Sequence, residues 1–318
     1  MRSRISLIFF LATILFTSLL RADSSVFLFD DDALASRDDF HYTGGLFYGY
    51  MFDENRSFIN PKFLKSLHNT NALSFTYMAF TPEDKESHER VLNDIPYAGY
   101  MKIEFSDYKY DNNMFLNLAI NISAVGPDVK AKQIQSNFHK LIGHSTPNGW
   151  DNQLKDHLFA GLKVGYGKKS AKMNFKKLQI DWCNYIEGEL GNFYSGVSFS
   201  SVLRFANNLP DTFALIPNLS NGTTDELLNF KPMKNFDWSV EVGLFANKVS
   251  NFYIIDRAID IGYKLSHIDY IYGLGASLNI FYNHIKYTFK IKTSTIHNKS
   301  ISTFDDEQWG SLSATWKF

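Results

Sequence analysis

Apolar and polar residues alternate one by one along many segments of this chain. In residues 116–123, leucine and isoleucine alternate with asparagine, alanine and serine. The same spacing recurs in residues 158–166, 238–244, 272–280 and 286–292, with polar, turn-like spacers in between. Because a period of two places successive side chains on opposite faces of a β-strand, the pattern predicts an all-β protein.

The alternation predicts twelve strands, and an even number is typical of bacterial single-chain barrels. We expect them at residues 26–29, 42–52, 72–80, 97–106, 114–125, 158–166, 178–186, 193–205, 237–247, 269–281, 285–293 and 310–318. Lysine, glutamate and glycine at the alternate positions suit the polar lumen of a transmembrane barrel, and aromatic residues near the segment ends suit its interfacial girdles. A secreted β-sandwich also alternates and is the other interpretation.

One segment between the predicted strands has helical spacing. Its apolar residues predict a short helix from Lys130 to Leu141. Loops that carry extra structure in such barrels are the extracellular ones, so we expect the helix there. The apolar positions are Val129, Ile134, Phe138, Leu141 and Ile142.

Residues 1–22 have the pattern of a secretory signal peptide. Arg2 and Arg4 precede an apolar run over residues 5–20, and cleavage is expected after Ala22. The mature barrel domain would then be residues 23–318. A single membrane anchor is the alternative, because the run is just long enough to span a bilayer.

Composition narrows the class of protein. The mean hydropathy of −0.21 is too polar for a bundle of transmembrane helices, although 16% of the residues are aromatic. After residue 20 no apolar run approaches the roughly 20 residues of a spanning helix. Since only helices and closed barrels satisfy the backbone in lipid, a membrane-embedded form of this chain must be a closed barrel.

Charge and cysteine content exclude two further classes. The formal charge is −1, and loss of the three signal-peptide arginines makes it more negative, so no basic excess suggests a nucleic-acid partner. Cys183 is the single cysteine. An intramolecular disulfide and a metal site built on several thiolates are therefore excluded.

The last residues have the clearest barrel pattern. Leu312, Ala314, Trp316 and Phe318 alternate with serine, threonine and lysine. A strand that ends on Phe318 resembles the signal read by the outer-membrane assembly machinery. We therefore expect that machinery as a partner, and the outer membrane of a Gram-negative bacterium as the location.

Groups suited to catalysis follow the predicted helix. His139, His144 and Ser145 offer a general base and a nucleophile, and Asn148, Asn152 and Gln153 offer orienting amides. A solvated loop with surface histidines is the other interpretation, and spacing alone favours it. The spacing therefore marks a candidate site without assigning a reaction.

Acidic residues gather near the first turn of the predicted barrel. Asp30, Asp31 and Asp32 close the first strand, and Thr43 lies near the start of the second. Carboxylate and hydroxyl oxygens at one rim suit Ca²⁺, although an acidic run is more often a solvated turn. The expected metal ligands are Asp30 and Asp31.

Three blocks of this sequence resemble the lipid A 3′-O-deacylase family of outer-membrane barrels. The third is the most specific, because it joins His-Lys-Leu-Ile-Gly to Pro-Asn-Gly-Trp-Asp-Asn-Gln. The resemblance covers the N-terminal half, and the C-terminal half adds the barrel pattern only. The blocks are residues 29–32 with 39–45, residues 81–82 with 94–99, and residues 133–154.

The resemblance implies a twelve-stranded, calcium-dependent hydrolase. Its substrate would be lipid A or lipopolysaccharide among the lipids of the outer leaflet, where it would cleave the ester that holds the 3′-linked acyl chains. His139 matches the catalytic histidine, which would activate water as a general base. Ca²⁺ or a lysine ammonium would stabilise the oxyanion of the transition state.

The other site residues follow from the same resemblance. Asp31 matches an acidic residue near the calcium, Thr43 matches a site threonine, and Lys85 matches a site lysine through a loop of different length. Two positions depart from the family. Asp30 stands where some members have asparagine, and Ser145 stands where one form has glutamate, so another group must orient the histidine here.

Two other functions remain open at this stage. His144-Ser145 with Asn148-Gly149 is similar to the motif of outer-membrane phospholipases with a serine nucleophile, although adjacent residues on a strand face opposite ways. A small porin or adhesin barrel needs no active site. Incubation with lipopolysaccharide separates all three.

Overall fold

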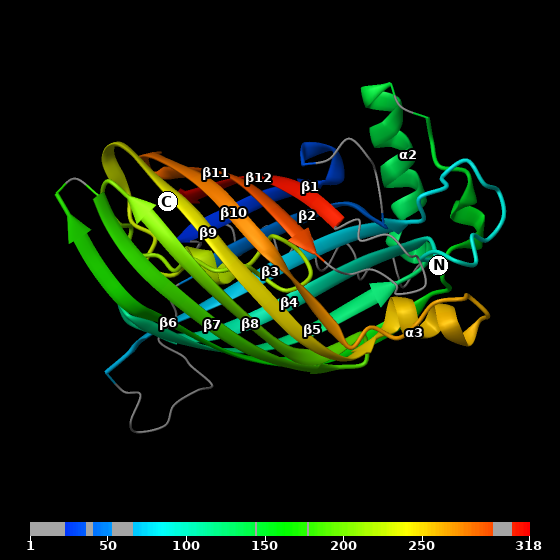
Figure 1. Ribbon diagram of the computed structural model, residues 1–318, viewed down its shortest axis with the longest axis horizontal. Coiled ribbons are helices and arrows are strands. Elements are labelled where there is room, and N and C mark those ends of the chain that lie inside the picture. Colours follow the sequence, from blue (N-terminus) through cyan, green and yellow to red (C-terminus); the bar gives the residue numbers. More distant parts are fainter. Residues whose placement is uncertain (1–22, 36–40, 53–65, 144, 177, 295–306) are drawn as a thin grey trace.

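The computed structural model describes residues 23–35, 41–52, 66–143, 145–176, 178–294 and 307–318. The described residues form twelve antiparallel strands that close into a barrel, in which β1 pairs with both β2 and β12 (Figure 1). This confirms the predicted fold class. The predicted signal peptide, residues 1–22, lies outside the described residues.

Each of the twelve predicted segments overlaps one strand, and most strands extend further than predicted. The longest, β9, has 20 residues. The strands are β1 Ser24–Asp31, β2 His41–Phe52, β3 His68–Thr81, β4 Ala98–Tyr110, β5 Met114–Val125, β6 His157–Phe175, β7 Leu178–Gly191, β8 Tyr194–Ala206, β9 Met233–Phe252, β10 Tyr270–Asn283, β11 Ile285–Ser294 and β12 Glu307–Lys317.

The period of two separates an apolar outer face from a polar lumen. On β5, Ile120 and Ile122 are about 60% exposed, whereas Asn121 and Ser123 between and after them are buried. On β11 the buried side chains include Lys290. Polar residues inside and apolar residues outside are the inverse of a soluble sandwich, as expected of a barrel in lipid.

The two ends of the barrel differ in structure. At one end β1 begins and β12 ends, with Ser24 opposite Lys317. The other end, here called the helical end, carries helix α2 (Ala131–Ile142), the 3-10 helix η4 (Gly149–Asn152) and helix α3 (Tyr253–Asp260) (Figure 1). Helix α2 confirms the predicted helix to within one residue at each end. Helix α3, of eight residues, was not predicted.

Residues 207–232, which join β8 to β9, fold back into the lumen and are here called the plug. Leu227 and Leu228 are buried there with aromatic residues of the barrel wall, and the 3-10 helix η5 (Thr224–Leu227) lies in the same segment. Glu226 contacts Lys286 and Lys290 on β11 at 3.3 and 2.6 Å. No pattern in the sequence predicted the plug.

None of the helices within the described residues is of sufficient length and apolar character to cross a membrane.

Candidate functional site

Helix α2 lies against the barrel wall along one face. Ala131, Gln135 and His139 are spaced four residues apart, so they share that face, and all three are buried. Gly99 on β4 permits the close approach, because a Cβ there would lie 2.5 Å from the Cβ of Ala131. The Trp150 indole N–H donates to Gln135 Oε1 at 2.7 Å and ties η4 to the helix.

The contact is on the outside of the barrel. Tyr77 and Ala79 of β3 alternate with Thr76 and Met78, which line the lumen, so the first pair faces outward. Helix α2 and η4 therefore cover part of the outer wall. The buried cluster they form there contains Tyr77, Ala79, Tyr97, Val129, Ala131 and Trp150.

An aromatic contact brings the end of β1 to the end of α2. The ring centroids of Phe29 and Phe138 lie 5.7 Å apart. Phe27, which is 43% exposed, shows that odd residues of β1 face outward, and Asp31 continues this face. The predicted site residue Asp31 thus lies on the outer face of β1, whose Phe29 packs against the neighbour of His139.

The imidazole of His139 is buried and held in a defined orientation. Its Nδ1 lies 2.6 Å from the main-chain oxygen of Ser145, and a carbonyl can only accept, so Nδ1 carries the proton. Nε2 is then the nitrogen with the lone pair. Gly143, with φ of 77°, ends the helix and turns the chain back toward His139.

Ser145 contacts His139 through its carbonyl rather than its hydroxyl. The side chain at position 145 therefore takes no part in this contact with the imidazole. The contact gives no support to a serine nucleophile activated by His139. His144, the other histidine of this segment, lies outside the described residues.

A β-bulge places Thr43. Tyr42 pairs with Phe80 and Gly44 pairs with Ala79, so Thr43 is the extra residue on β2. Its Oγ1 lies 2.5 Å from Oγ1 of Thr81, an outward position on β3. Thr81 was not among the predicted site residues, although Thr81-Pro82 begins the second matching block.

Lys85 lies in the loop over residues 82–97, which is hydrogen-bonded to Asn148 and Asn152. Its carbonyl accepts the Asn148 N–H at 2.8 Å, and the Asn148 side-chain amide donates to the Glu86 carbonyl at 3.2 Å. Asn152 donates in the same way to the His88 carbonyl at 2.8 Å. These bonds join the third matching block to the loop that connects the two parts of the second block, at the helical end.

The charged and titratable groups around α2 and η4 interact only with near neighbours. Lys132 donates to Asp151 at 2.6 Å, and this hydrogen bond lowers the pKa of the exposed Asp151 carboxyl. Burial raises the pKa of the Tyr97 phenol to about 12, so Tyr97 stays protonated beside Trp150. Neither group changes its charge near neutral pH.

The prediction that Asp30 and Asp31 bind one metal ion together needs a correction, which concerns Asp30. Its side chain points into the lumen, the opposite direction to Asp31, because neighbouring residues of a strand face opposite ways. Asp30 Oδ2 accepts the Tyr42 hydroxyl at 2.9 Å and the Asn221 N–H at 3.2 Å. The structure therefore does not bring Asp30 and Asp31 together as ligands of one ion.

A calcium site here would rest mainly on neutral oxygen donors. Within the described ranges, no three His, Cys, Asp or Glu residues come together as metal ligands. One carboxylate, Asp31, shares the outer rim with the hydroxyls of Thr43 and Thr81. Hard oxygen donors of this kind fit Ca²⁺, which accepts hydroxyl and carbonyl oxygens, better than they fit Zn²⁺.

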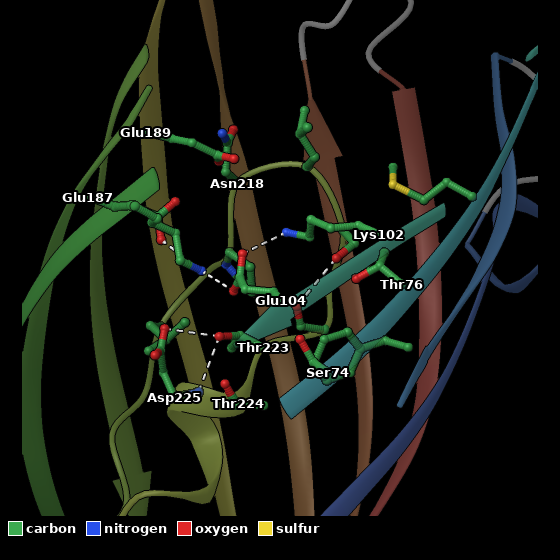
Figure 2. Close-up of a pocket in the computed structure, with 18 of the residues that line it drawn as sticks. Ser74, Thr76, Lys102, Glu104, Glu187, Glu189, Asn218, Thr223, Thr224 and Asp225 are labelled. Carbon is green, nitrogen blue, oxygen red and sulfur yellow. Dashed lines mark hydrogen bonds and ion pairs between the residues drawn. The ribbon is translucent and has the colours of Figure 1, made fainter. Parts of the chain in front are cut away.

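A second candidate site lies in the lumen between the plug and β3, β4, β6 and β7. It is a small cavity of about 60 Å³. Figure 2 shows residues that line it. Its charges pair with each other, since Glu104 contacts Lys102 at 3.1 Å and Lys163 at 2.6 Å, and Lys163 also contacts Glu187 at 3.6 Å. Such a polar, internally paired lining does not suit acyl chains.

Comparisons with known proteins agree with this architecture. The family model described as outer membrane protein LpxR matches residues 7–318. LpxR from Salmonella typhimurium has a similar structure, with a TM-score of 0.76 and 15% identity over 93% of this chain and 100% of that chain. At that identity the structural likeness shows the fold alone.

Two other barrels are more distant. The β domain of the Bordetella autotransporter BrkA has a TM-score of 0.47 and 8% identity, over 94% of this chain and 100% of that chain. The KdgM porin has a TM-score of 0.38 and 5% identity, over 93% and 99%. No curated protein sequence matches significantly. Because the family model spans nearly the whole chain, this outer-membrane barrel belongs to the LpxR family.

Proposed function

We propose that this protein is a calcium-dependent ester hydrolase that removes the 3′-linked acyl chains of lipid A. The observation that carries the proposal is His139, which is buried on the outer wall with Nδ1 on the Ser145 carbonyl. A histidine fixed in this tautomer presents Nε2 as a general base. Its position outside the barrel suits a substrate that resides in the membrane.

Apolar side chains exposed at the helical end favour an amphiphilic substrate. On α2, Ile134 and Leu141 are 42% and 82% exposed, whereas the Ala131 and His139 side faces the wall. At the start of β6, Leu158 is 79% exposed. Exposed apolar side chains on the outer surface at this end of the barrel suit contact with acyl chains.

The chain's own residues supply the main steps. Nε2 of His139 takes a proton from water, which attacks the ester carbonyl, and the Ser145 carbonyl stabilises the imidazolium through Nδ1–H. The ammonium of Lys85 favours the negative charge that develops on the carbonyl oxygen. The protonated His139 then gives its proton to the leaving alkoxide.

Calcium belongs to the same proposal. Asp31, with the Thr43 hydroxyl and main-chain oxygens at the rim, would hold the ion. Bound Ca²⁺ would act as a Lewis acid on the ester.

Neither alternative function gains support from the geometry. A phospholipase with Ser145 as nucleophile needs its hydroxyl beside a base, and the contact to His139 is made by the carbonyl. A porin needs an open lumen, and the plug fills this one with buried leucines and paired charges.

The test is incubation of the purified protein with lipopolysaccharide and Ca²⁺ in detergent, followed by mass spectrometry of the lipid A. The expected product lacks the 3′-linked acyl chains. Phospholipid vesicles serve as the second substrate, and release of fatty acid from them alone would assign the phospholipase function. No change in either substrate would contradict the proposal.

A further inference from the structure

The outer-face residues Asp31 and Thr43 each have a neighbour in the chain that faces the lumen. Asp30 precedes Asp31, and Tyr42 precedes Thr43. These two neighbours are joined, because the Tyr42 hydroxyl donates to Asp30 Oδ2 at 2.9 Å. A lumen-side bond therefore fixes β1 and β2 at the places from which Asp31 and Thr43 project.

The local packing leaves room for the Tyr42–Asp30 hydrogen bond and holds the Tyr42 ring. Asp30 pairs with Gly45 across the two strands, and a Cβ on Gly45 would collide with the Tyr42 hydroxyl oxygen. Because Gly45 has no side chain, the space through which the Tyr42 phenol reaches Asp30 stays open. The Tyr42 ring also packs edge-on against Trp309, with centroids 5.5 Å apart. The Tyr42–Asp30 hydrogen bond is made by the residue that directly precedes Thr43, the extra residue of the bulge.

The plug supplies a third group to the hydrogen bonds around Asp30. The Asn221 N–H donates to the same oxygen of Asp30 at 3.2 Å. Asn221 is held in turn by Lys290, whose Nζ donates to its carbonyl at 3.3 Å and to Glu226 at 2.6 Å. The plug is therefore connected through Asp30 to the strand that carries Asp31.

We propose that Asp30, Tyr42 and the Asn221 N–H, here called the lumen clamp, position Asp31 and Thr43 for the reaction on the opposite face of the wall. Asp30 and Tyr42 are positioning residues, and Asp30 is not a metal ligand. The proposal rests on the proposed function. Partners of this kind matter because a ligand or donor acts only when its own backbone and rotamer are fixed.

Tyr42→Phe removes the hydroxyl and keeps the ring against Trp309. Tyr108→Phe is the matched control, because Tyr108 is a buried lumen tyrosine that also contacts the plug, through Asp225 Oδ1 at 2.6 Å. Tyr108 lies near the opposite end of β4 from Gly99 and α2, away from the clamp. Both variants lose one buried hydroxyl, so a structural role alone would make them alike.

Three readouts separate positioning from stability. We expect Tyr42→Phe to lower kcat on lipopolysaccharide by about 10- to 100-fold and to raise the Ca²⁺ concentration for half-activation. We also expect faster hydrogen–deuterium exchange in the peptide that contains Asp31, which requires no activity. Tyr108→Phe should change none of these three, with a similar decrease in melting temperature for both variants.

Substitutions of Asp30, the acceptor of these hydrogen bonds, also test whether Asp30 is a positioning residue. Asp30→Asn keeps an oxygen acceptor for Tyr42 and Asn221, whereas Asp30→Ala does not. We expect Asp30→Asn to recover most of the kcat lost in Asp30→Ala and to need no more Ca²⁺ than wild type. A raised Ca²⁺ requirement in Asp30→Asn, which keeps the acceptor for Tyr42 and Asn221, would assign Asp30 as a ligand and overturn the clamp.

The two proposals fail in different ways. If wild type leaves lipid A intact, the proposed function is wrong. If wild type is active and Tyr42→Phe matches Tyr108→Phe in kcat, Ca²⁺ requirement and exchange, the lumen clamp is wrong and the function stands.

Discussion

Nδ1 of His139 and the carbonyl oxygen of Ser145 lie 2.6 Å apart, across a turn that begins at Gly143. The bond joins the last turn of α2 to the segment that follows it. It fixes both the orientation and the tautomer of the imidazole, as carboxylates do in other catalytic histidine pairs. Because a main-chain atom does this, the identity of the side chain at position 145 is left unconstrained.

The first prediction follows from this bond. His139→Ala removes the base, so kcat should fall by about 10² or more. Ser145→Ala keeps the carbonyl and should leave kcat within a few-fold of wild type. Rates are read from the mass spectrum of lipid A. Labelling of Ser145 by a fluorophosphonate, together with an active His139→Ala variant, would instead assign a serine nucleophile.

Gly143 gives the second prediction. Its φ of 77° is costly for other residues, and a Cβ there meets nothing within 4 Å, so Gly143→Ala strains the backbone without a clash. The carbonyl of Ser145 should shift, and kcat should fall by about tenfold.

Gly262→Ala is the matched control for that variant. Gly262 follows α3 with φ of 96° and equally open space. It should lose comparable stability and keep full activity. Equal loss of activity in both variants would show that general loosening, rather than the His139 contact, is responsible.

Barrel strands were predictable because their signal is local. Ile120, Asn121 and Ile122 reveal both faces of β5 within three positions. The plug has no such period, since Leu227 and Leu228 are adjacent and both buried, next to the buried charge of Glu226. Its burial depends on lysines 60 or more residues away. Long-range pairing of this kind leaves no periodic pattern in the sequence.

The site was predictable only in part. Resemblance marked His139, and spacing alone did not separate it from a surface histidine. The opposite directions of Asp30 and Asp31 follow from the pleat of a strand and were accessible from sequence. The displacement of Thr43 by a bulge and the return of the Ser145 carbonyl were not, because both depend on how separate segments meet.

The third prediction concerns the metal. The donors at the rim are oxygens, so EGTA should abolish activity and Ca²⁺ should restore it better than Zn²⁺. Asp31→Ala should reproduce the effect of EGTA and resist rescue by excess Ca²⁺. Lipid A mass spectra across a buffered Ca²⁺ series measure this. Full activity of wild type in excess EGTA would exclude a calcium requirement.

The last prediction concerns the ion pair between Arg204 and Asp181, which lies next to the start of the plug. Arg204 donates to Asp181 through Nε at 3.0 Å and Nη2 at 2.6 Å, and its remaining donors hold Pro210 and Thr212. Asp181→Leu leaves a buried guanidinium without its carboxylate, which should cost about 3–5 kcal/mol of unfolding free energy in detergent micelles. Adding Arg204→Met removes that charge and should restore most of the loss. Urea unfolding of the two single variants and the double variant measures the coupling. Additive losses would show that the pair contributes little. Ion conductance through Arg204→Met is a separate measurement, and a rise in this variant alone would show that the bonds from Arg204 to Pro210 and Thr212 keep the lumen closed.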